Sequence, residues 1–94
     1  MPIRILQLKA GDVARAKLGA RGISVAEARQ LLHNRNAVIR NPRRRRWNDD
    51  RQMLVGQTDG GRVLTLVVER TFDPISWVIV TGWTADSRER KVID

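Results

Sequence analysis

The chain has 94 residues, a net charge of +8, no cysteine and a single histidine. A chain of this length holds one domain with one modest core, and we expect that domain to span residues 1–94. The composition excludes disulfides and metal sites built from thiolates or several histidines, so no metal and no cofactor are expected. No apolar run approaches the ~20 residues that cross a bilayer, and no signal-peptide pattern opens the chain, which predicts a soluble cytoplasmic protein.

The first third of the chain predicts a strand and two helices. Residues 3–8 alternate imperfectly between apolar and polar side chains, as a short strand does. Residues 12–20 follow with helical spacing. Ser24 and Glu27 form a capping box, in which each side chain accepts the backbone amide of the other residue, so a second helix is expected to begin there. The short link between these helices predicts a helical hairpin.

The remainder of the chain predicts a sheet and a last short helix. Antiparallel strands are expected at four apolar segments, which cover residues 37–40, 51–57, 62–69 and 77–83. A second capping box, from Asp86 to Glu89, opens a short basic helix over residues 88–92. The predicted fold class is α+β: a helical hairpin packed on a mainly antiparallel four- to five-stranded sheet, with a short C-terminal helix.

The last predicted strand carries two of the three tryptophans. Strand alternation places Trp77, Ile79, Thr81 and Trp83 on one face. We expect Trp77 to pack against the helical hairpin, and Trp83 to lie nearer the open end of the sheet.

Arginine dominates the positive charge. Fifteen of the 18 basic residues are arginines, the others being Lys9, Lys17 and Lys91. The planar guanidinium group binds phosphate or carboxylate oxygens in pairs, which points to recognition of such groups. The net charge is +5 over residues 1–36, +4 over residues 37–56 and −1 over residues 57–94, so a polarised surface is expected. The alternative is a general arginine preference that carries no information about a ligand.

The segment after Pro42 is the clearest nucleic-acid candidate in the sequence. Four consecutive arginines, Arg43, Arg44, Arg45 and Arg46, precede Trp47. Guanidinium groups contact phosphates, and an indole stacks on an unpaired base. Two alternatives stay open. The segment is a solvated loop partly neutralised by acidic neighbours, or it docks an acidic partner protein.

Several short motifs, taken in order, resemble the BrnT-like toxins of bacterial type II toxin–antitoxin systems, within the RelE/ParE-like superfamily. They lie at residues 22–28, 41–42, 55–58, 61–64, 77–85 and 88–90. The resemblance covers roughly residues 3–92, and the order and spacing of the motifs carry it. It implies an endoribonuclease that inhibits translation in the bacterial cytoplasm. It also implies a cognate antitoxin with a ribbon-helix-helix domain, and contact with operator DNA only through that antitoxin.

The chain departs from the family pattern at several positions. Arg21 stands where the family has histidine, and Val78 and Trp83 stand where it has arginines. The usual tyrosine near the end of the family's sequences has no counterpart, because the chain contains none. These departures bear on the catalytic residues more than on the fold.

Metal-independent RNA cleavage uses the neighbouring 2′-hydroxyl as nucleophile and needs proton transfer groups and cations. We expect Arg51 and Arg88 to hold the scissile phosphate, and Glu89 and His33 to serve as the acid–base candidates. Each has a structural alternative. His33 suits the C-terminal end of a helix, and the capping box accounts for Glu89 without chemistry.

The residues expected to bind RNA are basic or aromatic and lie in three places. They are Arg43, Arg44, Arg45, Arg46 and Trp47 in the loop, Trp83 at the end of the last strand, and Arg90 and Lys91 in the last helix. Compensation of the helix dipole is the alternative for Lys91. The rival to an enzyme is an inactive module of the toxin fold that binds RNA or an acidic protein. Binding of DNA by the basic loop is a third hypothesis.

Overall fold

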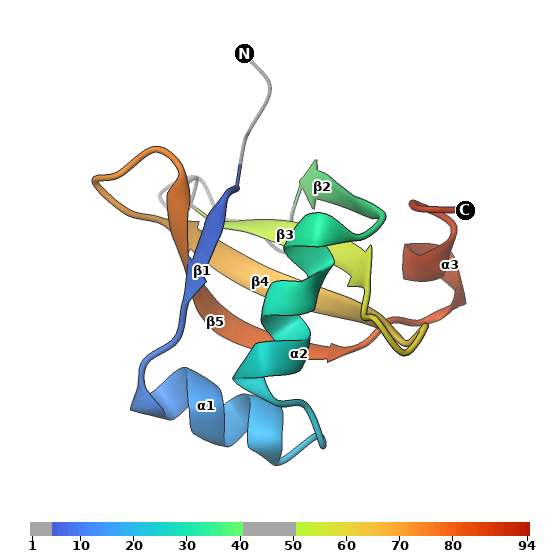
Figure 1. Cartoon of the computed structure of the whole chain (residues 1–94), viewed down its shortest axis with the longest axis horizontal. Coiled ribbons are helices and arrows are strands. Elements are labelled where there is room, and N and C mark those ends of the chain that lie inside the picture. Colours follow the sequence, from blue (N-terminus) through green and yellow to red (C-terminus); the bar gives the residue numbers. More distant parts are fainter. Residues whose placement is uncertain (1–4, 41–50) are drawn as a thin grey trace.

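The computed structural model describes residues 5–40 and 51–94 and shows the α+β fold that the sequence predicts (Figure 1). The elements, in chain order, are β1 (Gln7–Lys9), α1 (Asp12–Gly19), α2 (Val25–Gln30), the 3-10 helix η1 (Leu31–His33), β2 (Asn36–Arg40), β3 (Arg51–Gln57), β4 (Val63–Arg70), β5 (Ser76–Thr84) and α3 (Ser87–Arg90). The five strands form one sheet in the order β1-β5-β4-β3-β2. The short β1 pairs with β5 in parallel, and every other pairing is antiparallel.

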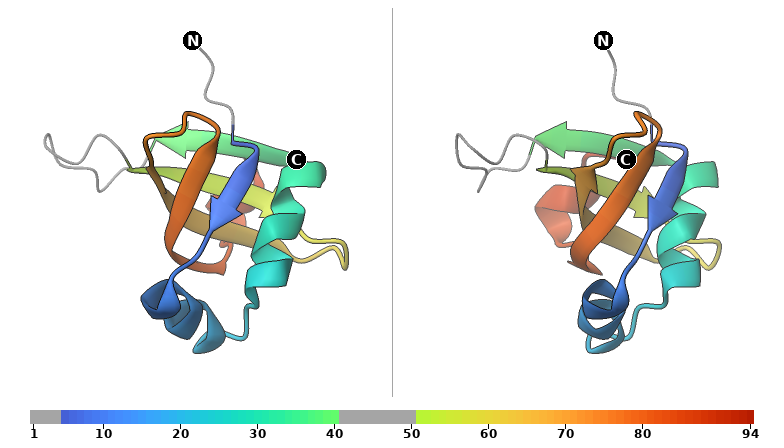
Figure 2. Two further views of the ribbon diagram at one scale, coloured as in Figure 1. Left: turned by 60° about the vertical axis from the view of Figure 1, so that its left-hand side comes forward. Right: turned by 90° about the vertical axis from the view of Figure 1, so that its left-hand side faces the viewer.

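The helices lie on both sides of the sheet. Figure 2 shows α2 on one side of the sheet and α3 on the other, with α1 at the end near β5. The main core fills the space between the sheet and α1–α2, where leucines from both layers meet and Leu18, Leu31, Leu64 and Leu66 are fully buried. Burial of each such side chain stabilises the fold by about 1.5–3 kcal/mol. No helix within residues 5–40 and 51–94 has the length and apolar character needed to cross a membrane.

Both predicted capping boxes are confirmed. The Ser24 hydroxyl accepts the Glu27 amide at 3.0 Å, and Glu27 Oε1 accepts the Ser24 amide at 3.5 Å. Asp86 and Glu89 make the same reciprocal pair, with both bonds at 2.9 Å. These contacts satisfy amides that an isolated helix leaves unpaired, so each helix begins directly after its predicted N-cap residue. The last helix is shorter than expected, because α3 ends at Arg90 and not at Val92.

The predicted face of β5 is wrong, because the strand contains a β-bulge. Val68 pairs with Ile79, and the preceding residue of β4, Val67, pairs with Thr81. Val80 therefore has no partner on β4 and is an extra residue of β5. One extra residue reverses the alternation of side chains. Trp77 and Ile79 face the main core as expected, whereas Thr81 and Trp83 face the opposite side. Gly82 now points inward, where an added Cβ atom would lie 3.0 Å from Leu18.

Candidate nucleic-acid interface

One face of the sheet carries α3, and we call it the α3 face. Side chains at alternate positions of the three central strands line it. They are Arg51, Met53 and Val55 on β3, Val63, Thr65, Val67 and Glu69 on β4, and Thr81 and Trp83 on β5. We call residues 85–93, which contain α3, the α3 segment. This segment is fixed at one end of the face, because Ala85 and Ile93 pack on Val55.

Trp83 and Glu89 are joined by hydrogen bonds on the α3 face. The indole Nε1 donates to both carboxylate oxygens of Glu89, at 3.1 Å to Oε1 and 3.2 Å to Oε2. Oε1 also accepts the Asp86 amide at 2.9 Å. Glu89 is half-buried, and these donors fix its carboxylate. It offers an oriented acceptor, although both oxygens already have a partner.

Arg21 reaches the same group from the loop between α1 and α2. Its Nη1 donates to the Thr81 hydroxyl at 3.2 Å and to the Gly82 carbonyl at 2.8 Å. Its guanidinium carbon lies 6.0 Å from the centroid of the Trp83 ring, within the range of a cation–π contact. The sequence marked Arg21 only as a departure from the family pattern. Its role beside Trp83 depends on the bulge in β5, which leaves no local signal.

Arg51 lies at the opposite end of the α3 face from α3. It opens β3, and its Nε is 3.2 Å from Glu69 Oε1 in a pair that is more than one-third exposed on each side. The backbone amide of Ala85, which leads into α3, donates to the Val63 carbonyl at 3.0 Å. Val63 pairs with Gln57, the last residue of β3, so α3 lies at the Gln57 end of the sheet. The six residues from Arg51 to that position span about 20 Å. The structure thus places Arg51 apart from α3 and does not gather Arg51 and Arg88 around one phosphate.

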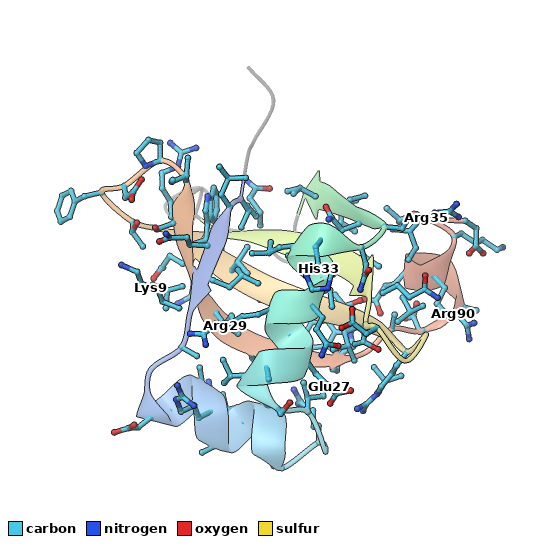
Figure 3. The ribbon with its side chains drawn as sticks, viewed as in Figure 1. Lys9, Glu27, Arg29, His33, Arg35 and Arg90 are labelled. Carbon is cyan, nitrogen blue, oxygen red and sulfur yellow. The ribbon has the colours of Figure 1, made fainter. Side chains whose placement is uncertain are left out.

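His33 lies away from this group, on the helical side of the sheet, where Figure 3 shows it on the segment after α2. Its Nε2 is 2.8 Å from Asp59 Oδ1, and Asn34 Nδ2 donates to the same oxygen at 2.8 Å. The hydrogen bond from Asn34, followed by the contact with His33, lowers the pKa of Asp59 below its ordinary value. His33 therefore joins η1 to the β3–β4 turn, and the structure does not bring it to Glu89.

Several arginines bind the backbone of the protein itself. Arg29 Nε donates to the Leu8 carbonyl of the edge strand β1 at 3.0 Å. Arg35 Nη1 donates to the Ile93 carbonyl at 3.1 Å and so ties the C-terminal segment to the start of β2. These groups add to the net charge, but their donors are partly occupied, so part of the basicity has a structural role.

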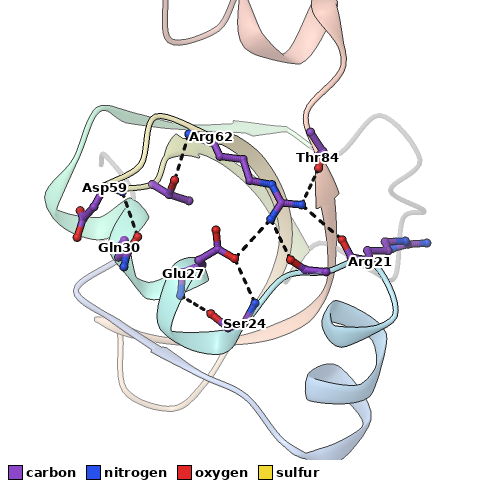
Figure 4. Close-up of polar contacts among 9 residues, drawn as sticks. Arg21, Ser24, Glu27, Gln30, Asp59, Arg62 and Thr84 are labelled. Atoms are coloured by element: carbon purple, nitrogen blue, oxygen red, sulfur yellow. Dashed lines mark hydrogen bonds and ion pairs between the residues drawn. The ribbon is translucent and has the colours of Figure 1, made fainter.

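Arg62 is the most connected of these arginines, and Figure 4 shows its contacts. One guanidinium nitrogen donates to the Gly22 carbonyl at 2.9 Å and to Glu27 Oε1 at 3.4 Å. The other donates to the Thr84 hydroxyl at 3.1 Å and to the Arg21 carbonyl at 3.4 Å. Arg62 thereby connects the α1–α2 loop with the start of α2 and the end of β5.

Three cations of the α3 segment remain available for a ligand. Arg88, Arg90 and Lys91 are exposed, and within residues 5–40 and 51–94 their side chains make no hydrogen bond or ion pair. The predicted loop residues, Arg43–Arg46 and Trp47, lie outside the described residues. Within the described part of the chain, no three histidine, aspartate or glutamate side chains gather in a way that would hold a metal ion.

The end of the α3 face that carries the α3 segment therefore combines the oriented carboxylate of Glu89, the indole of Trp83 with Arg21 beside it, and three exposed cations. Such a group can bind phosphates and accept a proton. A scan against models of known protein families finds no match to the chain, and a search of curated proteins finds none either.

Proposed function

We propose that the chain is a toxin-type endoribonuclease that binds single-stranded RNA at the α3 end of the sheet and inhibits translation by cleaving it. The observation that carries this proposal is the arrangement of Trp83, Glu89 and Arg21 beside the exposed Arg88 and Arg90. The observed α+β fold is also the one that the resemblance to BrnT-like toxins implies. The net charge of +8 favours a polyanionic substrate, because lysine and arginine contacts release counterions from the nucleic acid.

In this proposal Glu89 acts as the general base. The 2′-oxygen of the substrate attacks the adjacent phosphorus, and its proton passes to the Glu89 carboxylate. The bond from phosphorus to the 5′-oxygen breaks, that oxygen takes a proton from water, and a 2′,3′-cyclic phosphate remains. Arg88 stabilises the extra negative charge on the phosphoryl oxygens in the transition state. Arg51, at the far end of the face, binds the same RNA strand at a different phosphate.

The proposed partner is an antitoxin with a ribbon-helix-helix domain, as the family resemblance implies. An acidic segment of that protein would neutralise Arg88, Arg90 and Lys91, and charge complementarity would speed the encounter. Covering this end of the α3 face would exclude RNA, and operator DNA would be contacted through the antitoxin.

A second function is favoured by one observation on Glu89. Both of its oxygens accept hydrogen bonds from Trp83, and one also accepts the Asp86 amide. A carboxylate held in this way has a structural role that needs no chemistry. The second proposal is therefore an inactive module that uses the same face to bind RNA without cleaving it.

The deciding experiment incubates the purified protein with end-labelled single-stranded RNA in the presence of a metal chelator. Cleavage that leaves a 2′,3′-cyclic phosphate supports the enzyme. Glu89→Gln retains acceptor and capping ability, so it should keep RNA affinity while cleavage falls about 10²-fold or more. Arg88→Ala should weaken both, whereas Arg15→Ala, an exposed arginine of α1 on the helical side, serves as the matched control. Salt-sensitive binding with intact RNA would support the module, and absence of RNA binding would refute both proposals.

A further inference from the structure

The turn between β4 and β5 holds an aromatic side chain entirely in water. Phe72 has a relative exposure of 109%, whereas the other large exposed apolar side chains of the described residues, Leu6, Val13 and Val92, lie between 38% and 69%. A phenyl ring in this position contributes no burial to the fold and loses the stabilisation that burial would give. The fold therefore gives no reason for a phenylalanine at this position.

Side-chain hydrogen bonds order the turn that carries Phe72. The Thr71 hydroxyl donates to the Ser76 carbonyl at 2.6 Å, contacts the Asp73 carbonyl at 3.0 Å and accepts the Asp73 amide at 3.2 Å. The Asp73 carboxylate accepts the Ile75 amide at 3.1 Å and the Ser76 hydroxyl at 3.2 Å. Because these bonds order the turn before any ligand arrives, a partner that stacks on the ring meets a smaller entropic cost.

The position of the turn relates Phe72 to the α3 face. Arg70 ends β4 two residues before Phe72, and its guanidinium carbon lies 5.7 Å from the Trp77 ring centroid, so its side chain is on the helical side of the sheet. Arg51 lies on the neighbouring strand, where it is paired with Glu69 across the ladder. The turn thus stands at the end of the face opposite α3, about 16 Å along β4 from Thr65, the partner of Trp83. Arg51, on the α3 face, and Phe72 therefore lie at the same end of the sheet.

We propose that Phe72 is a stacking platform for one unpaired base of a single-stranded RNA, with Arg51 contacting an adjacent phosphate. This inference rests on the proposed function and extends its binding site to the far end of the sheet. RNA is favoured over an apolar pocket of a protein partner because the chain has a net charge of +8 and Arg51, on the strand beside β4, lies at the same end of the sheet as the turn. Every base has a π-face, so the contact adds affinity with little dependence on sequence.

The test measures the affinity of Phe72→Ala and Phe72→Trp for a short single-stranded RNA at one fixed salt concentration. Loss of a base–aromatic stack should weaken binding by at least about fivefold in Phe72→Ala, and Phe72→Trp should restore it. Val13→Ala removes an exposed apolar side chain from α1 and should leave affinity unchanged. Because the Phe72 ring is fully exposed, thermal unfolding of Phe72→Ala should match that of the parent protein.

A set of RNAs, each lacking one base, identifies the stacked position. At one position, removal of the base should cost as much as Phe72→Ala, and the two changes together should cost no more than either alone. Full affinity of Phe72→Ala for an RNA that the parent protein binds would overturn the stacking proposal and leave the proposed function intact. Failure of the parent protein to bind RNA would refute the proposed function itself.

Discussion

Replacement of Arg62 tests how far the arginines of this protein stabilise its fold. Arg62→Met keeps much of the aliphatic stem and removes the four hydrogen bonds that the guanidinium group donates. Two of these bonds have good lengths, 2.9 Å to Gly22 and 3.1 Å to Thr84, and two are long at 3.4 Å. A hydrogen bond contributes about 0.5–1.5 kcal/mol net, so the two shorter bonds predict a loss of about 2 kcal/mol in the free energy of unfolding.

Urea unfolding followed by circular dichroism measures this loss. In a domain of this size, 2 kcal/mol corresponds to a fall of roughly 10 °C in the melting temperature. Arg62→Lys keeps the charge but not the fork of donors, so it should recover only a small part of the loss. Arg15→Ala, on the exposed side of α1, should change stability by less than about 0.5 kcal/mol. A loss below 0.5 kcal/mol in Arg62→Met would show that water replaces these contacts, and the structural role assigned to the arginines would be wrong.

Three further predictions concern glycines and one ion pair. Gly82→Ala should lower the free energy of unfolding by about 1–3 kcal/mol in urea titrations, because the new Cβ atom would lie 2.6 Å from Leu66; an unchanged midpoint would contradict the inward direction of Gly82. Gly19→Ala should raise stability by up to about 1 kcal/mol, since open space surrounds that position in α1, and a loss would show unseen strain. The lowered pKa of Asp59 predicts stability that is present above its ordinary value of 3.8 and is lost as the pH falls through the lower folded value. Asp59→Asn should therefore flatten the acid limb of a stability–pH curve, and an unaltered acid limb would contradict this assignment.

Local patterns accounted for much of the fold. Ser24 and Glu27 are neighbours on one helical turn, so their capping box can be predicted from spacing alone. The strand predicted over residues 51–57 matches β3 at both ends, because its apolar run is bounded by polar segments and a glycine turn. The parallel pairing of β1 with β5 joins segments about 70 residues apart, and no local signal specifies it.

The candidate site was less predictable than the fold, since it depends on distant contacts. Arg35 binds the Ile93 carbonyl, 58 residues away, and a backbone acceptor leaves no mark in the sequence. The sequence shows that the chain is basic, but it could not separate the arginines that bind the backbone of the fold from those that face solvent. His33 was a candidate because histidine is a common proton-transfer residue, yet its position beside Asp59 is set by the β3–β4 turn.

The extra residue in β5 also determines which changes of chain length the protein can accept. Val80 is the residue without a partner on β4, so its deletion would restore regular pairing while Thr81, Gly82 and Trp83 keep their present partners and faces. One residue inserted after Thr81 would instead move Trp83 along the strand by one position and turn its indole toward the main core. The insertion would therefore disrupt both the core packing and the carboxylate–indole pair. β5 is expected to accept the loss of one residue at the bulge more readily than the gain of one beyond it.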